Sequence, residues 1–356
     1  MNFFNKDDKR AIDAINKAQG ITWGPLVFQS TRALKELGIL SLVQQKGDNG
    51  ISLEDVSSSL NLSLYGTRVL LEAGLGIGLV YLNKENNYVL TKTGFFILND
   101  KMTKINMDFV HDVCYLGMFN IKESILNGKP EGLKVFGNWG TIYEGLSQLP
   151  ANIQKSWFEF DHYYSDISFP TVMPYIFKDN PKMIYDVGGN TGKFSLQCVQ
   201  YNSDVNVKIL DLPGQLALAK KNIDEVGLGN RITFHPINLL DPNESFPAGA
   251  DLVWMSQFLD CFSEQEIVSI LVRAKESISN TGSIYILETY WDRQKFEAAA
   301  FSLQQTSLYF TAMANGNSQM YHSKNMIQCI HAAGLYVKED IDEIGICHTL
   351  FRCMKN

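Results

Sequence analysis

A carboxylic acid and closely spaced glycines occur together where an apolar run of the chain ends. Asp186 lies in the apolar run 183–187, and Gly188, Gly189 and Gly192 follow it. Glycines let a backbone approach a ligand closely, and the N-terminus of a following helix offers free N–H groups. The stretch predicts a buried strand, a ligand-binding turn and the start of a helix.

A second acid, Asp211, ends the next apolar run, 205–210, where it can bind both hydroxyls of a ribose. A dinucleotide site would carry the spacing G-x-G-x-x-G with a pyrophosphate at the helix N-terminus. Asp186 would repel a pyrophosphate but suits a cation, such as the amino group or sulfonium of S-adenosylmethionine. We therefore predict S-adenosylmethionine as the cofactor. The alternative is an ordinary tight turn of an α/β protein.

Composition excludes several classes of protein. The chain has 356 residues, of which 45% are hydrophobic and 19% charged, and its net charge is −7. These values are typical of a globular protein of two domains without general affinity for nucleic acid or anionic membranes. No apolar run reaches the roughly 20 residues of a membrane span, and the N-terminus lacks a signal-peptide core. The six cysteines form no C-x-x-C pair, which predicts reduced thiols in the cytoplasm and no metal site.

The N-terminal part of the chain has the pattern of helices followed by a β-hairpin. Apolar residues recur at helical spacing over 28–40 and 64–74, and Ser52 is expected to cap a helix between them. The runs 79–82 and 88–91 flank a polar turn, as in a hairpin. Helices and a hairpin in this order predict a winged-helix arrangement.

A winged helix can bind DNA by placing its third helix in a major groove. Residues 1–100 contain ten Lys and Arg and ten Asp and Glu, and the third helix offers only Arg68 as a cation. A DNA-binding domain should show a basic face. We therefore predict no nucleic-acid binding, with a winged-helix regulator as the alternative.

Strands and helices alternate from residue 183 onward. The expected strands are 183–187, 205–210, 231–235, 250–255, 283–288, 336–342 and 346–353. Such alternation predicts an α/β, Rossmann-like domain with a mostly parallel, seven-stranded sheet. The short last connection predicts an antiparallel C-terminal hairpin at the edge of the sheet.

Beyond these patterns, several motifs match one known family. They are Leu-Thr-Lys-Thr-Gly after the hairpin, Phe-Gly-Asn-Trp-Gly-Thr-Ile-Tyr-Glu, the glycine loop and Asp-Leu-Pro after the second strand, at 90–94, 136–144, 186–192 and 211–213. With them the chain resembles, over nearly its whole length, the S-adenosylmethionine-dependent O-methyltransferases of the plant caffeate and acetylserotonin type and their bacterial relatives.

The resemblance implies three regions and a homodimer. Residues 1–105 would form a winged-helix dimerisation domain, and residues 179–356 the cofactor-binding methyltransferase domain. Residues 106–178, which are rich in aromatic side chains, would form a helical linker that lines the substrate pocket. Core packing is the alternative explanation for those aromatic residues.

The resemblance also implies a set of cofactor-binding residues. Asn190 stands where the family has a third glycine, and Asn tolerates left-handed backbone better than most residues. Asn238 and Leu239 stand where the family often has an acid near the adenine, and the Asn238 oxygen can still accept a hydrogen bond. The implied residues are Asp186, Gly188, Gly189, Asn190, Gly192, Asp211, Leu212, Asn238, Leu239 and Ser256.

The catalytic segment departs from the family pattern. Asp260 stands where the family has its general-base histidine, and Glu288 matches the first acid that orients that histidine. The second orienting acid falls at Met320. Two close carboxylates can share a proton, and an acidic acceptor would need no strong base. His162 is another candidate base.

We expect methyl transfer to a small aromatic hydroxyl or to a carboxyl group. C-methylation of an activated ring is one alternative, and cofactor binding without methyl transfer is another, because the catalytic histidine is absent. The expected pocket residues, for which core packing is again an alternative, are Phe158, His162, Phe301, Met313 and Met320.

Overall fold

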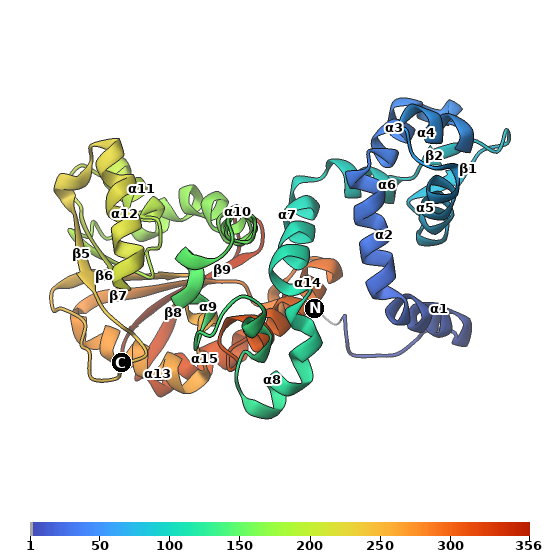
Figure 1. Cartoon of the computed structure of the whole chain (residues 1–356). Coiled ribbons are helices and arrows are strands. Elements are labelled where there is room, and N and C mark those ends of the chain that lie inside the picture. The colour runs from blue at the N-terminus through green and yellow to red at the C-terminus, as the bar shows by residue number, and fades with distance from the viewer. Residues whose placement is uncertain (1–2) are drawn as a thin grey trace. The chain divides into compact units, whose positions relative to one another are not determined.

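The computed structural model describes residues 3–356. The chain forms two compact units, a smaller one that ends at Asp108 and a larger one from Phe109 to Asn356 (Figure 1). The expected division at 105 and 178 stays a prediction. No helix in the described part of the chain is long and apolar enough to cross a membrane.

The smaller unit consists of helices and one antiparallel hairpin. The helices are α1 (Ala11–Thr22), α2 (Gly24–Glu36), α3 (Ile39–Gln45), α4 (Leu53–Ser59), α5 (Leu64–Ile77), α6 (Lys92–Asn99) and α7 (Lys101–Phe109). The hairpin joins β1 (Val80–Leu82) to β2 (Tyr88–Leu90). Ser52 accepts a hydrogen bond from the Asp55 N–H at 3.1 Å, so the expected cap of α4 is confirmed. That this unit does not bind nucleic acid stays a prediction.

The larger unit contains a seven-stranded sheet in the order β5-β4-β3-β6-β7-β9-β8. Its strands are β3 (Met183–Val187), β4 (Asn206–Asp211), β5 (Ile232–Pro236), β6 (Ala250–Ser256), β7 (Ile278–Glu288), β8 (Leu335–Ile344) and β9 (His348–Lys355). All pairs are parallel except those that β9 makes with β7 and β8. The predicted Rossmann-like sheet with an antiparallel C-terminal hairpin is confirmed. Its strand order reverses between β3 and β6, which is where such sheets bind ligands.

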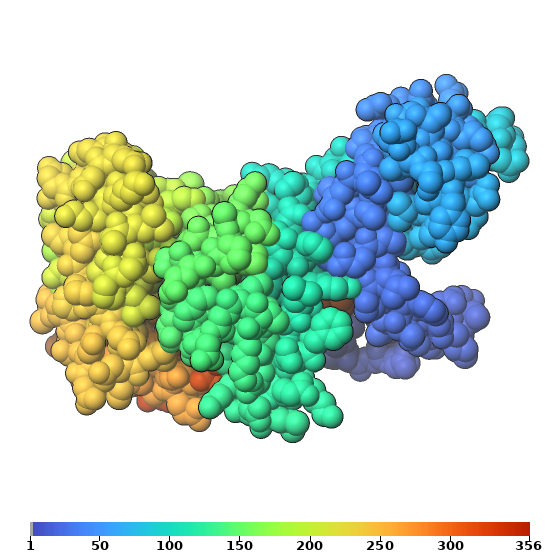
Figure 2. Space-filling view, in the orientation of Figure 1, coloured from blue at the N-terminus to red at the C-terminus, as the bar shows by residue number. Residues whose placement is uncertain are grey.

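Helices cover both faces of this sheet (Figure 1). The larger unit's α-helices are α8 (Ile121–Asn127), α9 (Ile142–Gly145), α10 (Ala151–Ile176), α11 (Lys193–Tyr201), α12 (Pro213–Val226), α13 (Glu264–Ser277), α14 (Glu297–Tyr309) and α15 (Ser323–Ala332). Figure 2 shows one outer face of the larger unit. This face consists of the segments around α8 to α10, in turquoise and green, and of the segment around α12, in yellow. Two single π-helical turns, Val110–Cys114 and Phe310–Ala314, adjoin α7 and α14.

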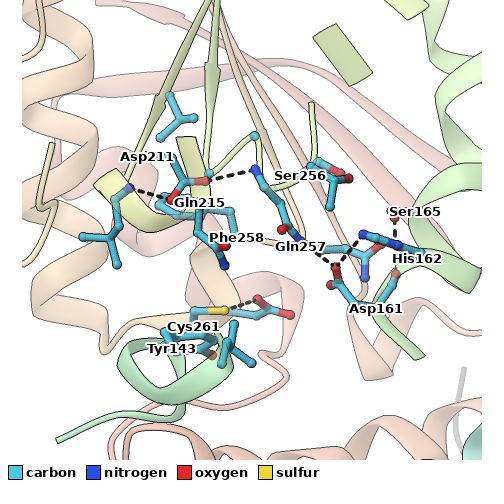
Figure 3. A pocket seen from close by; sticks show the side chains of 18 of the residues that line it. Tyr143, Asp161, His162, Ser165, Asp211, Gln215, Ser256, Gln257, Phe258 and Cys261 are labelled. Atoms are coloured by element: carbon cyan, nitrogen blue, oxygen red, sulfur yellow. Dashed lines mark hydrogen bonds and ion pairs between the residues drawn. The ribbon is translucent and has the colours of Figure 1, made fainter. Parts of the chain in front are cut away.

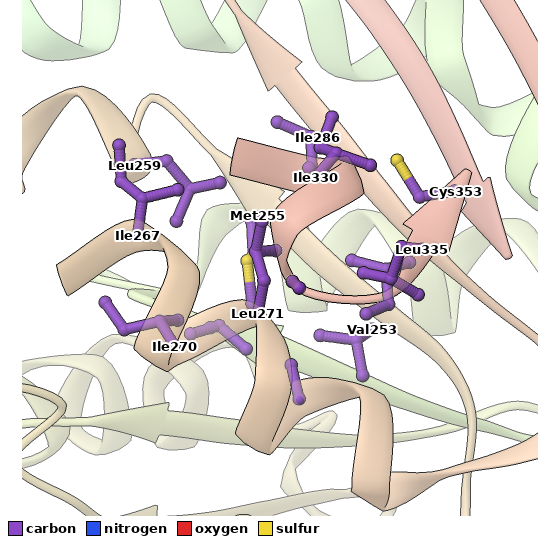
Figure 4. Packing of buried hydrophobic residues seen from close by; sticks show 14 of the residues in the cluster. Val253, Met255, Leu259, Ile267, Ile270, Leu271, Ile286, Ile330, Leu335 and Cys353 are labelled. Atoms are coloured by element: carbon purple, nitrogen blue, oxygen red, sulfur yellow. The ribbon is translucent and has the colours of Figure 1, made fainter. Parts of the chain in front are cut away.

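Buried apolar side chains pack against both faces of the sheet. On one face, Val253 and Met255 of β6 pack with Ile267 and Leu271 of α13 and with Ile330 of α15 (Figure 4). Each such buried side chain stabilises the fold by roughly 1.5–3 kcal/mol. The ends of the central strands are thereby held in fixed positions, and the loops that follow them carry the site.

The other face is covered by α10, α11 and α12. Phe194 of α11 stacks on Trp254 of β6, with ring centroids 4.3 Å apart and an interplanar angle of 6°. Val172 of α10 and Ile223 of α12 are fully buried in the same layer. Helix α10 thus lies against the sheet beside the glycine loop that opens α11.

Candidate active site

The glycine loop after β3 contains three left-handed residues. Gly188, Asn190 and Gly192 have φ angles of 68°, 48° and 78°. A Cβ atom on Gly188 would collide with the ring of Phe258, so this position excludes any side chain. Asn is among the residues that tolerate a left-handed backbone. Asn190 therefore adopts the left-handed conformation that this turn requires.

Asp211, at the end of β4, fixes this loop from the neighbouring strand. Its Oδ2 accepts a hydrogen bond from the Asn190 N–H at 2.9 Å, and its Oδ1 accepts one from the Leu212 N–H at 2.7 Å. Burial raises the pKa of Asp211 above its ordinary value. Each carboxylate oxygen keeps a second lone pair, so the group can still accept hydrogen bonds from two vicinal hydroxyls.

Asp186 lies beneath the loop. Its Oδ2 accepts a 2.6 Å hydrogen bond from the Ser195 hydroxyl, and a Cβ atom on Gly189 would lie 2.9 Å from that same oxygen. Burial raises the pKa of Asp186 to about 7. A cation bound beside it would lower this pKa again, so the buried carboxyl fits the positively charged cofactor predicted from the sequence.

One cavity of about 420 Å³ joins the strand ends to the helices of the larger unit (Figure 3). It brings together twelve of the residues predicted from the sequence. They are His162, Asp186, Gly188, Gly189, Asn190, Asp211, Leu212, Asn238, Leu239, Ser256, Asp260 and Met320.

Five predicted residues lie elsewhere. Phe301 is 56% exposed on α14, and Met313 is fully buried with its sulfur against Gly117. Phe158 contacts the rings of Trp157 and His162 but does not line the cavity. We therefore correct the expectation that these three side chains form the pocket.

The other two, Gly192 and Glu288, lie next to the cavity without lining it. Gly192 is the residue before α11, and a Cβ atom there would meet Ile223 of α12. Gly192 therefore allows the backbone to turn into α11 and does not itself line the cavity. Glu288 acts through the loop before Asp260, as the hydrogen bonds below show.

Aromatic side chains line the part of the cavity away from the glycine loop. They are Phe109, Tyr143, Trp157, Phe160, Tyr309 and Phe310. The Trp157 indole donates a 2.7 Å hydrogen bond to the Tyr309 hydroxyl, and Phe109 stacks on Phe160 at 4.0 Å. Aromatic walls of this kind suit a flat acceptor. Core packing holds for several of these rings too, since Phe109 and Tyr309 belong to a buried cluster.

Asp260 lies at the junction of the two parts. It occupies a short 3₁₀ turn, Leu259–Cys261, and is 5% exposed. The Cys261 thiol donates a weak hydrogen bond to Oδ1 at 3.4 Å. Burial raises the pKa of Asp260 to about 6. The helix that follows has its own capping box, Ser263 with Glu266, so Asp260 does not serve as a cap.

Glu288, at the end of β7, holds the backbone that precedes Asp260. Its Oε1 accepts hydrogen bonds from the N–H groups of Phe258 at 2.9 Å and Leu259 at 2.8 Å. Its Oε2 has no hydrogen-bond partner within residues 3–356. Burial, and then the charge of Asp260, raise the pKa of Glu288 well above its ordinary value. Two acids so placed share protons rather than both ionise.

His162 also lines the cavity, but its environment disfavours a role as base. Burial, and then Lys193, lower the pKa of His162 to about 4. A general base works best with a pKa near the working pH, and Asp260, at about 6, is closer to neutrality. Of the two candidates, Asp260 is the better base.

Two polar contacts connect α10 to the glycine loop. Asn190 donates at 3.1 Å to Oδ2 of Asp161, which Figure 3 labels. The Lys193 ammonium lies 2.6 Å from Asp166 Oδ2. Burial raises the pKa of Asp161 to about 7. Sequence reasoning missed both acids, although Asp161 is adjacent to the histidine it identified. Among residues 3–356, no group of three or more His, Cys, Asp or Glu is arranged to hold a metal ion.

Two family models match the chain. A Dimerisation2-like domain model matches residues 16–88, and an O-methyltransferase domain model matches residues 163–335. Together they cover parts of both units and most of the sheet. The second model includes the glycine loop, Asp211, Asp260 and Glu288.

Similar proteins are methyltransferases. The L-tyrosine C(3)-methyltransferase of Streptomyces lavendulae is 22% identical over 322 residues, which cover 89% of this chain and 86% of that protein. The acetylserotonin O-methyltransferase of Gallus gallus is 24% identical over 276 residues, covering 71% and 74%. The solved structure of the S-adenosylmethionine-dependent methyltransferase SibL has the same fold, with a TM-score of 0.70, 21% identity and coverage of 94% and 98%. The chain is therefore an S-adenosylmethionine-dependent methyltransferase in which an O-methyltransferase domain follows a Dimerisation2-like domain.

Proposed function

We propose that the enzyme transfers a methyl group to the hydroxyl of a small aromatic acceptor. The observation that carries this proposal is the single cavity that connects Asp211 and the glycine loop to Asp260 and to a wall of aromatic rings. A cofactor held at the loop would present its reactive end to an acceptor lying between those rings. Holding both reactants in one enclosed space supplies much of the rate enhancement in such reactions.

In this proposal the strand ends bind the cofactor. Asp211 receives the ribose hydroxyls, the backbone of Gly188 and Gly189 lies close to the ligand, and Asp186 favours its positive charge. Leu212, Asn238, Leu239 and Ser256 complete this side of the cavity. When bound, S-adenosylmethionine supplies an electrophilic methyl group.

Asp260 takes up the proton of the acceptor hydroxyl. With a pKa near 6 it is ionised at neutral pH, so it accepts a proton more readily than an ordinary exposed aspartate would. Glu288 keeps Asp260 in place through the backbone N–H groups of Phe258 and Leu259. Burial of both acids keeps bulk water away from the proton that Asp260 takes up.

The test has a binding arm and a transfer arm. We expect S-adenosylhomocysteine, the product of methyl transfer, to bind dialysed protein in calorimetry, and labelled methyl to pass from S-adenosylmethionine to phenols and aromatic hydroxy acids. No heat at millimolar ligand would contradict cofactor binding. Binding without transfer to any member of the panel would contradict the proposed reaction.

C-methylation is a second candidate, because the relative from Streptomyces lavendulae is an L-tyrosine C(3)-methyltransferase that matches 89% of this chain. The same base and cavity would serve, since a phenolate is nucleophilic at oxygen and at the adjacent ring carbon. Fragmentation of the product by mass spectrometry separates the two. Methyl on the ring of L-tyrosine would favour this candidate over O-methylation.

We also propose a homodimer formed through the smaller unit. Helix α1 buries none of its residues within the chain, and Ile15, Ile21, Trp23 and Leu26 are more than half exposed. Large exposed apolar surfaces usually mark interfaces, and the matching model is that of a dimerisation domain. Light scattering should give twice the 40.1 kDa of one chain. A monomeric mass would contradict the proposal.

For the location of the enzyme we propose the cytoplasm. All six cysteines are unpaired, and free thiols persist where the compartment is reducing. Cell fractionation tests this, and recovery of the protein outside the cytoplasmic fraction would contradict it.

A further inference from the structure

Gln257 is a polar side chain of the cavity that the proposed reaction does not yet use (Figure 3). It follows β6 directly and has a φ angle of 46°, while its N–H donates to the Leu287 carbonyl at 2.9 Å. A left-handed conformation costs a residue other than glycine roughly 1–2 kcal/mol. Such conformations persist where the surroundings fix them, and they occur often at functional sites.

A buried histidine holds the side chain of Gln257 from behind. His348 of β9 is fully buried, and its Nε2 lies 3.1 Å from Gln257 Oε1. Its Nδ1 lies 2.9 Å from the hydroxyl of Ser168, on α10. Burial lowers the pKa of His348 to about 4, so the ring is neutral at physiological pH. A neutral imidazole donates one hydrogen bond and accepts one.

The partners decide which nitrogen carries the proton. Gln257 Oε1 only accepts hydrogen bonds, so the His348 Nε2–H donates to it. Nδ1 then accepts from the Ser168 hydroxyl at 2.9 Å, and the Tyr164 carbonyl, 3.1 Å from the same hydroxyl, competes for its one proton. The Ile344 backbone also hydrogen-bonds the ring. The amide NH₂ of Gln257, which makes no hydrogen bond within residues 3–356, remains available to the cavity.

The sheet order places the Gln257 side chain away from the proposed adenosine site. Asp211 ends β4 and Asn238 lies just after β5, and both strands are on one side of β6. His348 lies on β9, on the other side, and draws the Gln257 side chain toward β9 and α10. Gln257 is thus directed away from the strand ends that would bind the adenosine part of the cofactor.

We propose that Gln257 donates a hydrogen bond to the acceptor oxygen and that His348 is the positioning residue that turns the amide NH₂ into the cavity. This inference rests on the proposed methyl transfer to an aromatic hydroxyl. A hydrogen bond to the ionised form of an acid favours that form. Gln257 would therefore bind a phenolate more tightly than a phenol. This preference would make it easier for Asp260 to remove the proton of the hydroxyl.

The test uses 4-nitrophenol, whose phenolate is yellow, with the full-length enzyme saturated with S-adenosylhomocysteine. The unaltered complex should bind the phenolate in preference to the phenol. Gln257→Leu should weaken phenolate binding by about tenfold or more and change phenol binding by less than about twofold. Leucine is unbranched at Cβ like glutamine, so the substitution adds little backbone strain.

Variants of the histidine test the positioning role. His348→Leu should lower phenolate affinity in the same direction, and should add no further loss to Gln257→Leu. His348→Gln should restore part of the affinity, because an amide can donate to Gln257 and accept from Ser168. Gln305→Leu, on the exposed surface of α14, is the matched control and should change nothing.

Three outcomes would overturn the inference. They are an unaltered complex without preference for the phenolate, a Gln257→Leu variant that keeps that preference, and a loss of S-adenosylhomocysteine binding as large as the loss of phenolate binding. The decisive variant is Gln257→Leu, so a poorly folded His348→Leu protein leaves the test intact. Failure of the proposed function would show differently, as an unaltered enzyme that neither binds the cofactor product nor transfers methyl.

Discussion

The two ends of the cavity are built in different ways. The cofactor end consists of strand ends and a backbone turn, in which Gly188 and Asn190 follow β3 and Asp211 ends β4. The acceptor end consists of side chains from segments far apart in the sequence, such as Tyr143, Trp157 and Tyr309. Backbone geometry tolerates little variation, whereas side chains on helices change without altering the fold. In the proposed reaction the cofactor end would therefore fix the chemistry, and the acceptor end would select the molecule that receives the methyl group.

Asp260, between these two ends, should show the largest effect. Asp260→Asn removes the proton acceptor with little change in volume, so we expect kcat to fall about 10²–10⁴-fold. The affinity for S-adenosylhomocysteine should change little, because Asp260 is not one of the residues proposed to hold the cofactor. Initial rates and calorimetry measure the two quantities.

The pH dependence of kcat provides a second test of Asp260→Asn. In the unaltered enzyme kcat should rise with pH through about 6, because the base must be deprotonated. That step should be missing in Asp260→Asn. A variant that keeps both its rate and the step would remove Asp260 from the mechanism.

Substitution of Asp211 tests cofactor binding separately from the acceptor end. Asp211→Ala leaves the N–H groups of Asn190 and Leu212 without their acceptor and removes the proposed ribose contact. Loss of hydrogen bonds to a charged group costs about 1.5–3 kcal/mol, so S-adenosylhomocysteine should bind roughly 10- to 150-fold more weakly. Asp204→Ala, an exposed acid paired with Lys182, is the control. Equal affinities in the two variants would contradict the assignment.

The difference between the two ends of the cavity also explains which site residues could be predicted from the sequence. Asp186 and Asp211 end apolar runs, and the ends of adjacent parallel strands meet at one edge of a sheet, so local patterns located the cofactor end. No local pattern says which residues of a long helix face the sheet. Asp161 on α10 was therefore missed.

The same reason explains the wrong pocket residues. Phe301 was predicted to line the pocket, whereas Thr306 of the same helix does. Five residues along a helix with 3.6 residues per turn place two side chains roughly 140° apart. Hydrophobicity alone did not distinguish these sides, and Phe301 lies on the exposed one.

Glu288 is buried behind the loop that precedes Asp260. We expect its substitution to change the free energy of unfolding. The folded protein holds a proton on Glu288 that the unfolded chain releases above the ordinary pKa of 4.5. The free energy of unfolding should therefore fall as pH rises above about 4.5, by at most about 1.4 kcal/mol per pH unit. Glu288→Gln keeps an oxygen that accepts from Phe258 and Leu259 but cannot ionise.

We expect this variant and the unaltered protein to unfold at similar urea concentrations at pH 5. At pH 8 the variant should be the more stable by about 1–3 kcal/mol. Cofactor-free protein is required, since ligand binding adds its own stabilisation. A difference that does not widen with pH would show that Glu288 is not protonated in the folded state.

Trp157 should show the smallest effect, confined to the acceptor end. Trp157→Phe keeps an aromatic wall but removes the 2.7 Å hydrogen bond from the indole to the Tyr309 hydroxyl. A less firmly held wall should raise KM for the acceptor by at most about fivefold, the equivalent of one neutral hydrogen bond, while kcat stays nearly constant. Cofactor affinity should not change, because the hydrogen bond lies in the aromatic part of the cavity. A variant that weakened cofactor binding as much as acceptor binding would show that the two ends are coupled, and the division between backbone-built and side-chain-built recognition would then fail.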